Sequence, residues 1–265
     1  MNEWVSRSLD VANSSGYLDK LSRIYPATRP PLRPLPDSIK QRISELHAAQ
    51  DKVKLVNLFL KLREVGTPFP FEHPYASLLY SHAELRAKNP TILKQIGNAL
   101  LAIPVSELIR GCERPADINR VLGAAFQDWI RRYFPSRGFR VLAELDFNSA
   151  TQASFLDAAN ATILHYVKDK LGYDFSLGRD FLAKIGKVYI MGEARFFSTY
   201  GGSQTRDLRS TLEFTKAHKM NLTTVAVVDG VIWFNKRYVE LLKKLKSGEP
   251  AITALLLEDF LNSFK

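Results

Sequence analysis

The chain has 265 residues, and its 37 lysines and arginines outnumber 27 aspartates and glutamates, giving a formal net charge of +10. A hydrophobic content of 46% with 24% charged residues is typical of a globular protein with a substantial core, and the basic charge fits a solubilising surface or a nucleic-acid partner about equally well. No apolar run reaches the roughly 20 residues of a membrane span, no signal region begins the chain, and a single cysteine excludes an internal disulfide, so we expect a cytoplasmic protein without membrane association.

The N-terminal part of the chain predicts helices after a proline-rich strap. Residues 25–36, YPATRPPLRPLP, exclude a helix interior and favour an extended path over the body, or one whose arginines contact phosphate. Asp37 is the expected N-cap of a helix over residues 38–65, where apolar residues recur at helical spacing. Two more helices are expected over residues 75–86 and 90–103, and nothing in this part suggests catalysis.

The C-terminal part alternates between helical and strand patterns. Residues 114–134 form a strong amphipathic pattern, and a strand over 139–145 and a helix over 155–171 are expected after it. A helix over 205–219 followed by a β-branched run at 223–228 predicts a strand parallel to the one before that helix, because a crossover helix joins parallel strands. The remaining expected elements are a strand over residues 231–234 and helices over 238–246 and 252–264.

A β-hairpin with its tip at residues 186–187 is the centre of the prediction. Glycine at the first position of a two-residue loop is what a type II′ turn requires. Pairing outward from the tip sets Ile185 opposite Val188 and Ala183 opposite Ile190. Because side chains alternate along a strand, these residues share one apolar face.

Continued outward, the same register sets Asp180 opposite Glu193, with Arg195 on the same face of the hairpin. Two carboxylate residues directly opposite each other, with Cβ atoms about 5 Å apart, repel each other and weaken the sheet unless a cation lies between them. A divalent metal ion is the natural candidate, because hard cations prefer carboxylate oxygens. The residues therefore predict a metal site at Asp180 and Glu193.

These residues also resemble a known family signature. Asp180, twelve intervening residues and Glu193-Ala194-Arg195 resemble the PD-(D/E)XK nuclease motif, and GRDF…YIMGEARFFSTYGGSQ resembles a group of type II restriction endonucleases that carry a GEAK-F…GG-Q stretch. Arg195 stands where that group has lysine. The helix over 114–134 resembles the same group through a set of spaced residues: Asn119, Arg120, Gly123, Phe126 and Trp129.

The resemblance implies an α/β fold with a mixed central β-sheet flanked by helices and an N-terminal helical lobe. It implies that residues 1–110 are the lobe with its proline-rich strap, and that residues 111–265 are the catalytic domain. It also implies a type II site-specific deoxyribonuclease that hydrolyses double-stranded DNA with Mg²⁺ and acts as a homodimer.

The resemblance assigns catalysis to Asp180, Glu193 and Arg195. It assigns the metal to Asp180, Glu193 and the carbonyl of Ala194, a set that suffices because Mg²⁺ keeps several waters and needs only one or two carboxylates. An extra acidic residue, which the superfamily sometimes takes from the preceding helix, would be Asp117 or Asp128; each is also well explained as an exposed structural aspartate.

Arginine at position 195 leaves a second hypothesis open. Guanidinium cannot act as a base, although it can hydrogen-bond to phosphate. If lysine acts as a cation, Arg195 replaces it; if lysine acts by losing its proton, the protein is a DNA-binding protein with the nuclease fold and weak or no cleavage. A nuclease of repair or recombination is a third hypothesis.

The candidate DNA-binding residues follow the hairpin. Gln204 can pair bidentately with adenine, and Arg206 and Arg209 can reach guanine or phosphate, with Ser203 beside them. The alternative interpretation is that the glycines at 201–202 turn the chain and Ser203 caps the following helix.

Overall fold

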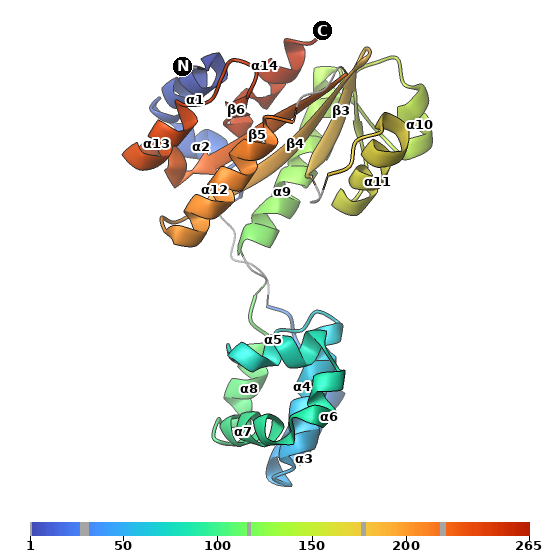
Figure 1. Cartoon of the computed structure of the whole chain (residues 1–265), viewed down its shortest axis with the longest axis vertical. Coiled ribbons are helices and arrows are strands. Elements are labelled where there is room, and N and C mark those ends of the chain that lie inside the picture. The colour runs from blue at the N-terminus through green and yellow to red at the C-terminus, as the bar shows by residue number, and fades with distance from the viewer. Residues whose placement is uncertain (1, 27–31, 116–117, 176–178, 218–220) are drawn as a thin grey trace. The chain divides into compact units, whose positions relative to one another are not determined.

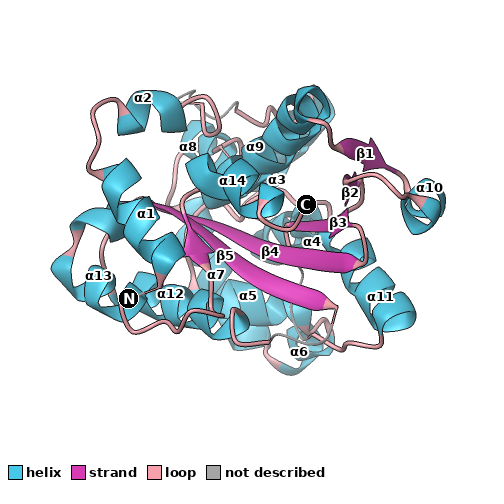
Figure 2. Cartoon of the chain, turned by 90° about the horizontal axis from the view of Figure 1, so that it is seen from above, coloured by secondary structure: helices cyan, strands magenta, loops and turns pink. Residues whose placement is uncertain are grey.

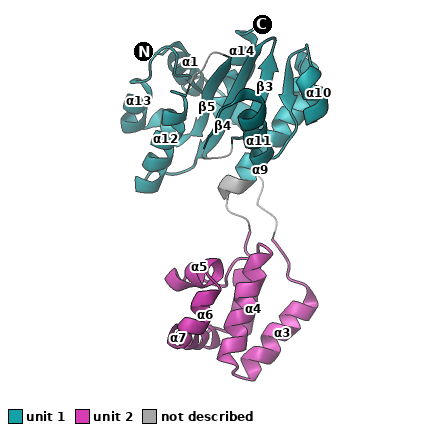
Figure 3. Cartoon of the chain, turned by 45° about the vertical axis from the view of Figure 1, so that its right-hand side comes forward, with its two compact units in different colours: residues 1–28, 118–265 teal, residues 29–117 magenta. Residues whose placement is uncertain are grey.

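The computed structural model describes residues 2–26, 32–115, 118–175, 179–217 and 221–265, without the side chains of residues 118–120. The chain forms two compact units, which are described separately: Met1–Thr28 with Ile118–Lys265, and Arg29–Asp117 (Figure 3). The larger unit contains the sheet, and the smaller one is helical. The helical unit is therefore an insertion between α2 (Tyr17–Leu21) and α9 (Ile118–Tyr133).

A mixed β-sheet forms the centre of the larger unit. In the described residues its six strands lie in the order β1-β2-β3-β4-β5-β6. β1 pairs with β2, β4 with β5 and β5 with β6 in parallel, whereas β3 is antiparallel to both of its neighbours. The bounds are β1 (Arg140–Leu142), β2 (Ser154–Leu156), β3 (Phe181–Ile185), β4 (Val188–Phe197), β5 (Leu222–Gly230) and β6 (Ala251–Ile252). The predicted α/β class with a mixed sheet is confirmed.

Helices cover both faces of the sheet (Figures 1 and 2). α9 packs on one face, and α11 (Asn160–Leu171) and α12 (Gly202–Phe214) pack on the other. The buried residues that join α9 to the hairpin are Phe126, Ile130, Phe181, Ala183 and Ile190. Those on the opposite face include Ile163, Val167, Leu182, Met191 and Phe214. The hairpin is therefore buried on both faces, which fixes its position in the core.

The hairpin β3–β4 has the predicted tip and register. Ile185 pairs with Val188, and Ala183 with Ile190. Of the two loop residues only Gly186 has a positive φ, +57°, as a type II′ turn requires. At Gly192 a Cβ atom would lie 2.0 Å from the ring of Phe181, so only glycine leaves room for that ring across β4.

The N-terminal helices belong to the sheet unit. Ser8, in α1 (Glu3–Ala12), accepts a hydrogen bond from the backbone N–H of Thr253 at 3.0 Å. The Asn2 side chain donates to the carbonyl of Glu249 at 3.1 Å. The compact units thus place these N-terminal helices with the sheet, whereas the predicted lobe comprised residues 1–110. The assignment of catalysis to residues 111–265 stays a prediction.

The helical unit has its own hydrophobic core. Two of its predicted helices, over residues 38–65 and 75–86, are each divided into two helices. The helix expected over residues 38–65 is wrong as a single element: it breaks at Gln50, whose φ of +54° is left-handed. Asp51 then caps the next helix by accepting from the N–H of Lys54 at 3.1 Å. The unit comprises α3 (Asp37–Ala48), α4 (Lys52–Glu64), α5 (Pro74–Ser81), α6 (Glu84–Lys88), α7 (Pro90–Leu101) and α8 (Val105–Cys112).

Four further predictions for the sheet unit are wrong in part. The strand predicted over 139–145 ends at Leu142, because α10 (Glu144–Ser149) follows it. The helix predicted from residue 155 begins only at Asn160, because Phe155 lies in β2. The strand predicted at 231–234 is the 3-10 helix η2 (Val231–Phe234), which follows a left-handed Gly230 with φ +90°. The last predicted helix starts as β6 and the 3-10 turn η3 (Ala254–Leu256) before α14 (Leu257–Asn262). The other short elements are η1 (Phe134–Arg137) and α13 (Lys236–Leu242).

No single helix in the described part of the chain is long and apolar enough to cross a membrane, although the bent pair α7 and α8 passes that test jointly by length and composition.

Candidate functional site

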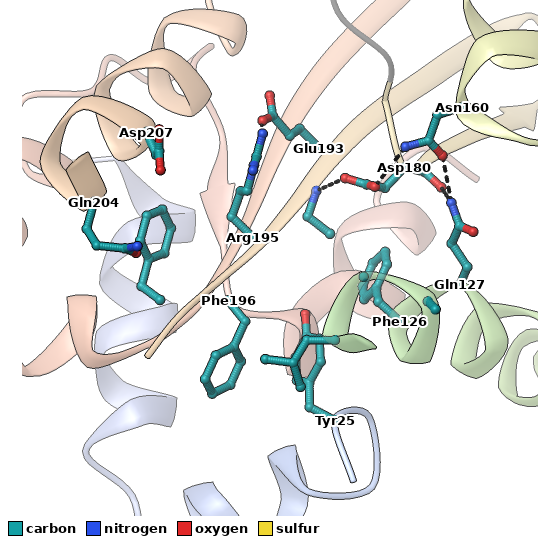
Figure 4. A pocket seen from close by; sticks show the side chains of 15 residues that line it. Tyr25, Phe126, Gln127, Asn160, Asp180, Glu193, Arg195, Phe196, Gln204 and Asp207 are labelled. Carbon is teal, nitrogen blue, oxygen red and sulfur yellow. Dashed lines mark hydrogen bonds and ion pairs between the residues drawn. The ribbon is translucent and has the colours of Figure 1, made fainter. Parts of the chain in front are cut away.

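A cavity of about 440 Å³ opens beside β4 in the sheet unit (Figure 4). Its walls come from α9, the start of α11, the approach to β3, β4 and the first turns of α12. The polar and charged residues that line it are Gln127, Asn160, Asp180, Glu193, Arg195, Gln204 and Asp207. Ala194 lines it as well. The four residues predicted for catalysis and metal binding therefore border one cavity.

Asp180 is tied to β4 through its own carboxylate. The regular register of the hairpin ends at the pair Phe181–Gly192. One residue further out, the N–H of Asp180 donates to the carbonyl of Gly192 at 2.9 Å, and the N–H of Ala194 donates to Oδ2 of Asp180 at 2.7 Å. The predicted direct pairing of Asp180 with Glu193 is thus not part of the regular ladder, because the aspartate side chain takes the place of a backbone acceptor.

Two amide side chains support Asp180 from the helices around it. Nδ2 of Asn160, the first residue of α11, donates to Oδ1 of Asp180 at 3.2 Å. Nε2 of Gln127, from α9, donates to Oδ1 of Asn160 at 2.7 Å and lies 3.3 Å from the carbonyl oxygen of Asp180. Sequence reasoning missed both amides. Gln127 directly follows Phe126 in the spaced pattern of α9, but no spacing indicates that its side chain reaches Asp180.

The surroundings of Asp180 disfavour its charged form. Burial raises the pKa of this carboxyl above its usual range, and the charge of Glu193 acts in the same direction. The hydrogen bonds from Ala194 and Asn160, with the charge of Arg195, oppose that rise without cancelling it. A cation placed beside Asp180 would therefore remove an electrostatic cost that the folded protein carries at neutral pH.

Glu193 is buried, with 4% of its surface exposed, and protein donors occupy both of its oxygens. Arg179 donates from Nη1 to Oε2 at 3.0 Å, and Arg195 donates from Nε to Oε1 at 2.9 Å. Thr211 of α12 adds a hydrogen bond from Oγ1 to Oε1 at 3.2 Å. An ion that binds Glu193 through Oε1 therefore competes with Arg195 and Thr211 for that oxygen.

Arg179 is a third residue that sequence reasoning missed. Its guanidinium carbon lies 4.0 Å from the centre of the Phe214 ring, and its side chain is nearly buried. Burial lowers the pKa of this guanidinium and Arg195 adds to the effect, whereas Glu193 and Asp180 oppose it. Its position immediately before Asp180 in the sequence was the one available signal.

The oxygen atoms at the cavity fit a hard divalent cation that is held by two side-chain ligands. Within the described residues no group of three or more histidines, cysteines, aspartates and glutamates is placed to hold a metal ion. Mg²⁺ does not need such a group, because it keeps several waters and is held by one or two carboxylates. Asp180 and Glu193 supply these two from one cavity wall.

Of the two candidates for a third acidic residue, the one that the structure describes does not reach this cavity. Asp128 is exposed, pairs with Arg131 at 3.1 Å and is not among the cavity-lining residues. Asp117 lies outside the described residues. Asp207 of α12, which the sequence did not single out, lines the cavity instead.

The predicted DNA-binding residues all lie in the first turns of α12. Gln204 is half-buried and lines the cavity, whereas Ser203, Arg206 and Arg209 are exposed outside its lining. Ser203 does not cap the helix, because α12 begins at Gly202 and Gly201 occupies the N-cap position without a side-chain hydrogen bond. Their contact with DNA stays a prediction.

Comparison with known proteins gives a match at the level of the family. A family model described as Tsp45I type II restriction enzyme matches residues 2–264, nearly the whole chain. No curated protein matches the chain, and no solved structure matches it.

Proposed function

Because the chain belongs to the Tsp45I family of type II restriction enzymes, which are site-specific deoxyribonucleases, we propose that it cuts double-stranded DNA at the cavity bordered by Asp180, Glu193 and Arg195. We assign the site to the PD-(D/E)XK class with arginine in place of lysine, and its cofactor is Mg²⁺. The observation that supports this most directly is that Asp180, Glu193, Ala194 and Arg195 border the same cavity.

Asp180 and Glu193 would hold the metal ion, together with the carbonyl oxygen of Ala194. When bound, Mg²⁺ supplies Lewis acidity toward a phosphoryl oxygen and lowers the pKa of a coordinated water. The protein's own contribution is orientation. Asn160 and the N–H of Ala194 fix the Asp180 carboxylate, and the raised pKa of Asp180 gives the site an electrostatic preference for a cation.

Arg195 is the cation of this site that can reach DNA. Its side chain is 49% exposed and lines the cavity, and a guanidinium binds phosphate oxygens through two parallel hydrogen bonds. Hydrolysis adds a water oxygen to phosphorus and breaks the bond to the leaving oxygen, while the attacking water loses a proton and the leaving oxygen gains one. The addition increases the negative charge on the phosphoryl oxygens. A guanidinium there stabilises that charge without any proton transfer of its own.

α12 presents the residues that would read or grip the DNA. Gln204 at the cavity is suited to a base edge, and Arg206 and Arg209 on the exposed side are suited to phosphates or guanine, with Ser203 adjacent. The proposed active form is a homodimer, because a two-fold symmetric enzyme matches the symmetry of a palindromic DNA site.

A second candidate is a family member that binds DNA and cleaves it weakly or not at all. It is favoured by two arginines on Glu193, which compete with a metal ion, and by the absence of a titratable lysine at position 195. Both candidates share the DNA-binding role and differ only in the chemistry at the cavity.

Plasmid digestion separates the two candidates. The protein is incubated with supercoiled plasmid in Mg²⁺ or in EDTA, and Asp180→Asn serves as the matched inactive variant. Discrete fragments that appear only with wild-type protein and Mg²⁺ support the proposal, and sequencing their ends gives the recognition site and the stagger. Intact plasmid in every arm, with a retained gel shift, supports the second candidate.

A further inference from the structure

The two arginines that contact Glu193 differ in their freedom to move. The Arg179 side chain is 9% exposed, lies against Phe214 and donates to Oε2. The Arg195 side chain is 49% exposed, lines the cavity and donates to Oε1. A long exposed side chain loses little packing when it changes rotamer, whereas a buried guanidinium that leaves its partner gives up an ion pair in a low-dielectric environment.

The four charged groups at and beside Glu193 sum to zero when both arginines are in place. Asp180 and Glu193 contribute two negative charges, and Arg179 and Arg195 contribute two positive ones. The positive charges of the two arginines reduce the Coulomb attraction of the two carboxylates for a divalent cation, and the cation also competes with Arg195 for Oε1 of Glu193. If Arg195 turns away, the remaining three groups carry one net negative charge and Oε1 keeps only its hydrogen bond from Thr211.

DNA offers Arg195 an alternative anion at the same cavity. A backbone phosphate accepts both N–H groups of a guanidinium, so the ion pair lost at Glu193 is replaced by one of the same kind. Phosphate oxygens also supply ligands that a site with two carboxylates lacks.

We propose that Arg179 is a fixed counter-ion that positions Glu193, and that Arg195 is a movable one that leaves Glu193 for a DNA phosphate, so that metal ion and DNA bind cooperatively. This inference rests on the proposed nuclease site. By thermodynamic linkage, the factor by which DNA raises the affinity of the protein for the metal ion equals the factor by which the metal ion raises its affinity for DNA.

Titration calorimetry with Mn²⁺ in the absence of DNA tests the movable arginine. Arg195→Met removes the competing cation and should tighten Mn²⁺ binding by about tenfold relative to wild type, which lies within the usual range of coupling between two sites. Arg237→Met is the control, because Arg237 is an exposed arginine of α13 outside the cavity lining and should leave the affinity unchanged. An Arg195→Met protein that binds Mn²⁺ no more tightly than wild type overturns the inference.

Two further titrations locate the effect. Asp180→Asn combined with Arg195→Met should abolish the gained Mn²⁺ binding; if it persists, the ion binds elsewhere and the inference is wrong. A DNA duplex that carries the mapped recognition site should tighten Mn²⁺ binding to wild type by about tenfold and to Arg195→Met much less. Equal tightening in both proteins contradicts a role for Arg195.

The role of Arg179 has a test of opposite sign. Through the Coulomb term alone, removal of a positive charge near a metal site raises the affinity of that site for a cation. If Arg179 positions Glu193, adding Arg179→Met to Arg195→Met should instead weaken Mn²⁺ binding, and Arg179→Lys should restore part of it. A further gain in affinity would show that Arg179 acts only through its charge. Circular dichroism verifies that each variant is folded. If the Arg179→Met variant is not folded, the test uses Arg179→Lys in its place, compared with the protein that keeps Arg179.

The titrations without DNA are independent of cleavage. Absence of Mg²⁺-dependent cutting would remove the proposed function, whereas unchanged DNA-free Mn²⁺ affinities in the arginine variants would remove only this inference.

Discussion

The backbone N–H of Ala194 donates to Oδ2 of Asp180 at 2.7 Å, so this carboxylate is fixed to the neighbouring strand by a bond that a side-chain amide oxygen can also accept. Asp180→Asn should therefore keep the fold. Burial raises the pKa of Asp180 above its unfolded value, so the charged carboxylate costs stability at neutral pH. Its neutral replacement removes that cost but places an amide hydrogen against Nδ2 of Asn160, so the melting temperature should stay near that of wild type. Cleavage should fall by at least about 100-fold, since a lost metal ligand exceeds the 10–100-fold effect of a lost supporting group.

Asp128→Asn is the matched control for that variant. Asp128 is exposed, pairs with Arg131 and lies outside the cavity lining, so cleavage should stay at the wild-type rate. Plasmid-cleavage rates and thermal melts on the two variants separate a site-specific loss from a general one. Equal losses of activity, or a large drop in melting temperature with Asp180→Asn alone, would contradict the assignment of Asp180.

Arg195→Lys should keep or raise the Mg²⁺-dependent cleavage rate. Lysine retains the positive charge at the phosphate, and its shorter reach weakens the contact that Arg195 makes with Oε1 of Glu193 at 2.9 Å. The measurement is the initial rate of supercoiled plasmid cleavage at saturating Mg²⁺. A fall to the EDTA background would show that the role given to position 195 is wrong.

The sequence predicted the hairpin well because local rules specify it. Gly186 sets the turn, alternation sets the faces, and the pairing of Ile185 with Val188 follows from both. The parallel strand β5 was also predictable, because a crossover helix between two strands has a strong handedness and pairing preference. These features require no knowledge of distant residues.

The contacts that complete the cavity depend on tertiary packing. Asn160 and Gln127 reach Asp180 only because α9 and α11 pack on opposite sides of the hairpin end, and no spacing in the sequence encodes that meeting. The prediction of short elements failed for a related reason. The strands β2 and β6 have three and two residues, which are too few for the alternation of apolar and polar residues to identify a strand. Continuous helical periodicity also hid the break at Gln50, where a left-handed residue and the capping Asp51 restart the helix.

Gly192→Ala should destabilise the protein by about 1–3 kcal/mol, the usual cost of overpacking a core. A Cβ at this position would lie 2.0 Å from the Phe181 ring, so the ring must move within a core buried on both faces of the hairpin. Combining Gly192→Ala with Phe181→Leu should recover part of the loss relative to the sum of the single changes. Urea unfolding of the three variants gives the coupling, and strict additivity would mean that the ring does not set the requirement for glycine.

Asp229 joins three parts of the sheet unit at the end of β5. Its fully buried carboxylate accepts hydrogen bonds from the hydroxyls of Tyr17 at 3.2 Å and Tyr25 at 3.3 Å. It also accepts from the Thr253 hydroxyl at 2.5 Å and the Ala254 N–H at 3.1 Å. Asp229→Asn turns one acceptor atom into a donor that faces these donors, so the variant should lose about 1–3 kcal/mol at pH 4.

The same residue makes part of the stability depend on pH. Burial raises the pKa of Asp229 to about 6, partly offset by its hydrogen bonds, from 3.8 in an unfolded chain. Between these two values the folded protein holds a proton that the unfolded chain has released, so this contribution is fully present below about pH 4 and is lost as the pH rises through 6. The stability of wild type relative to Asp229→Asn should therefore fall by roughly 2 kcal/mol from pH 4 to pH 7. Urea unfolding of both proteins at pH 4, 5, 6 and 7 measures the difference, in which other titrating groups cancel; a difference that stays constant, or grows with pH, contradicts the raised pKa.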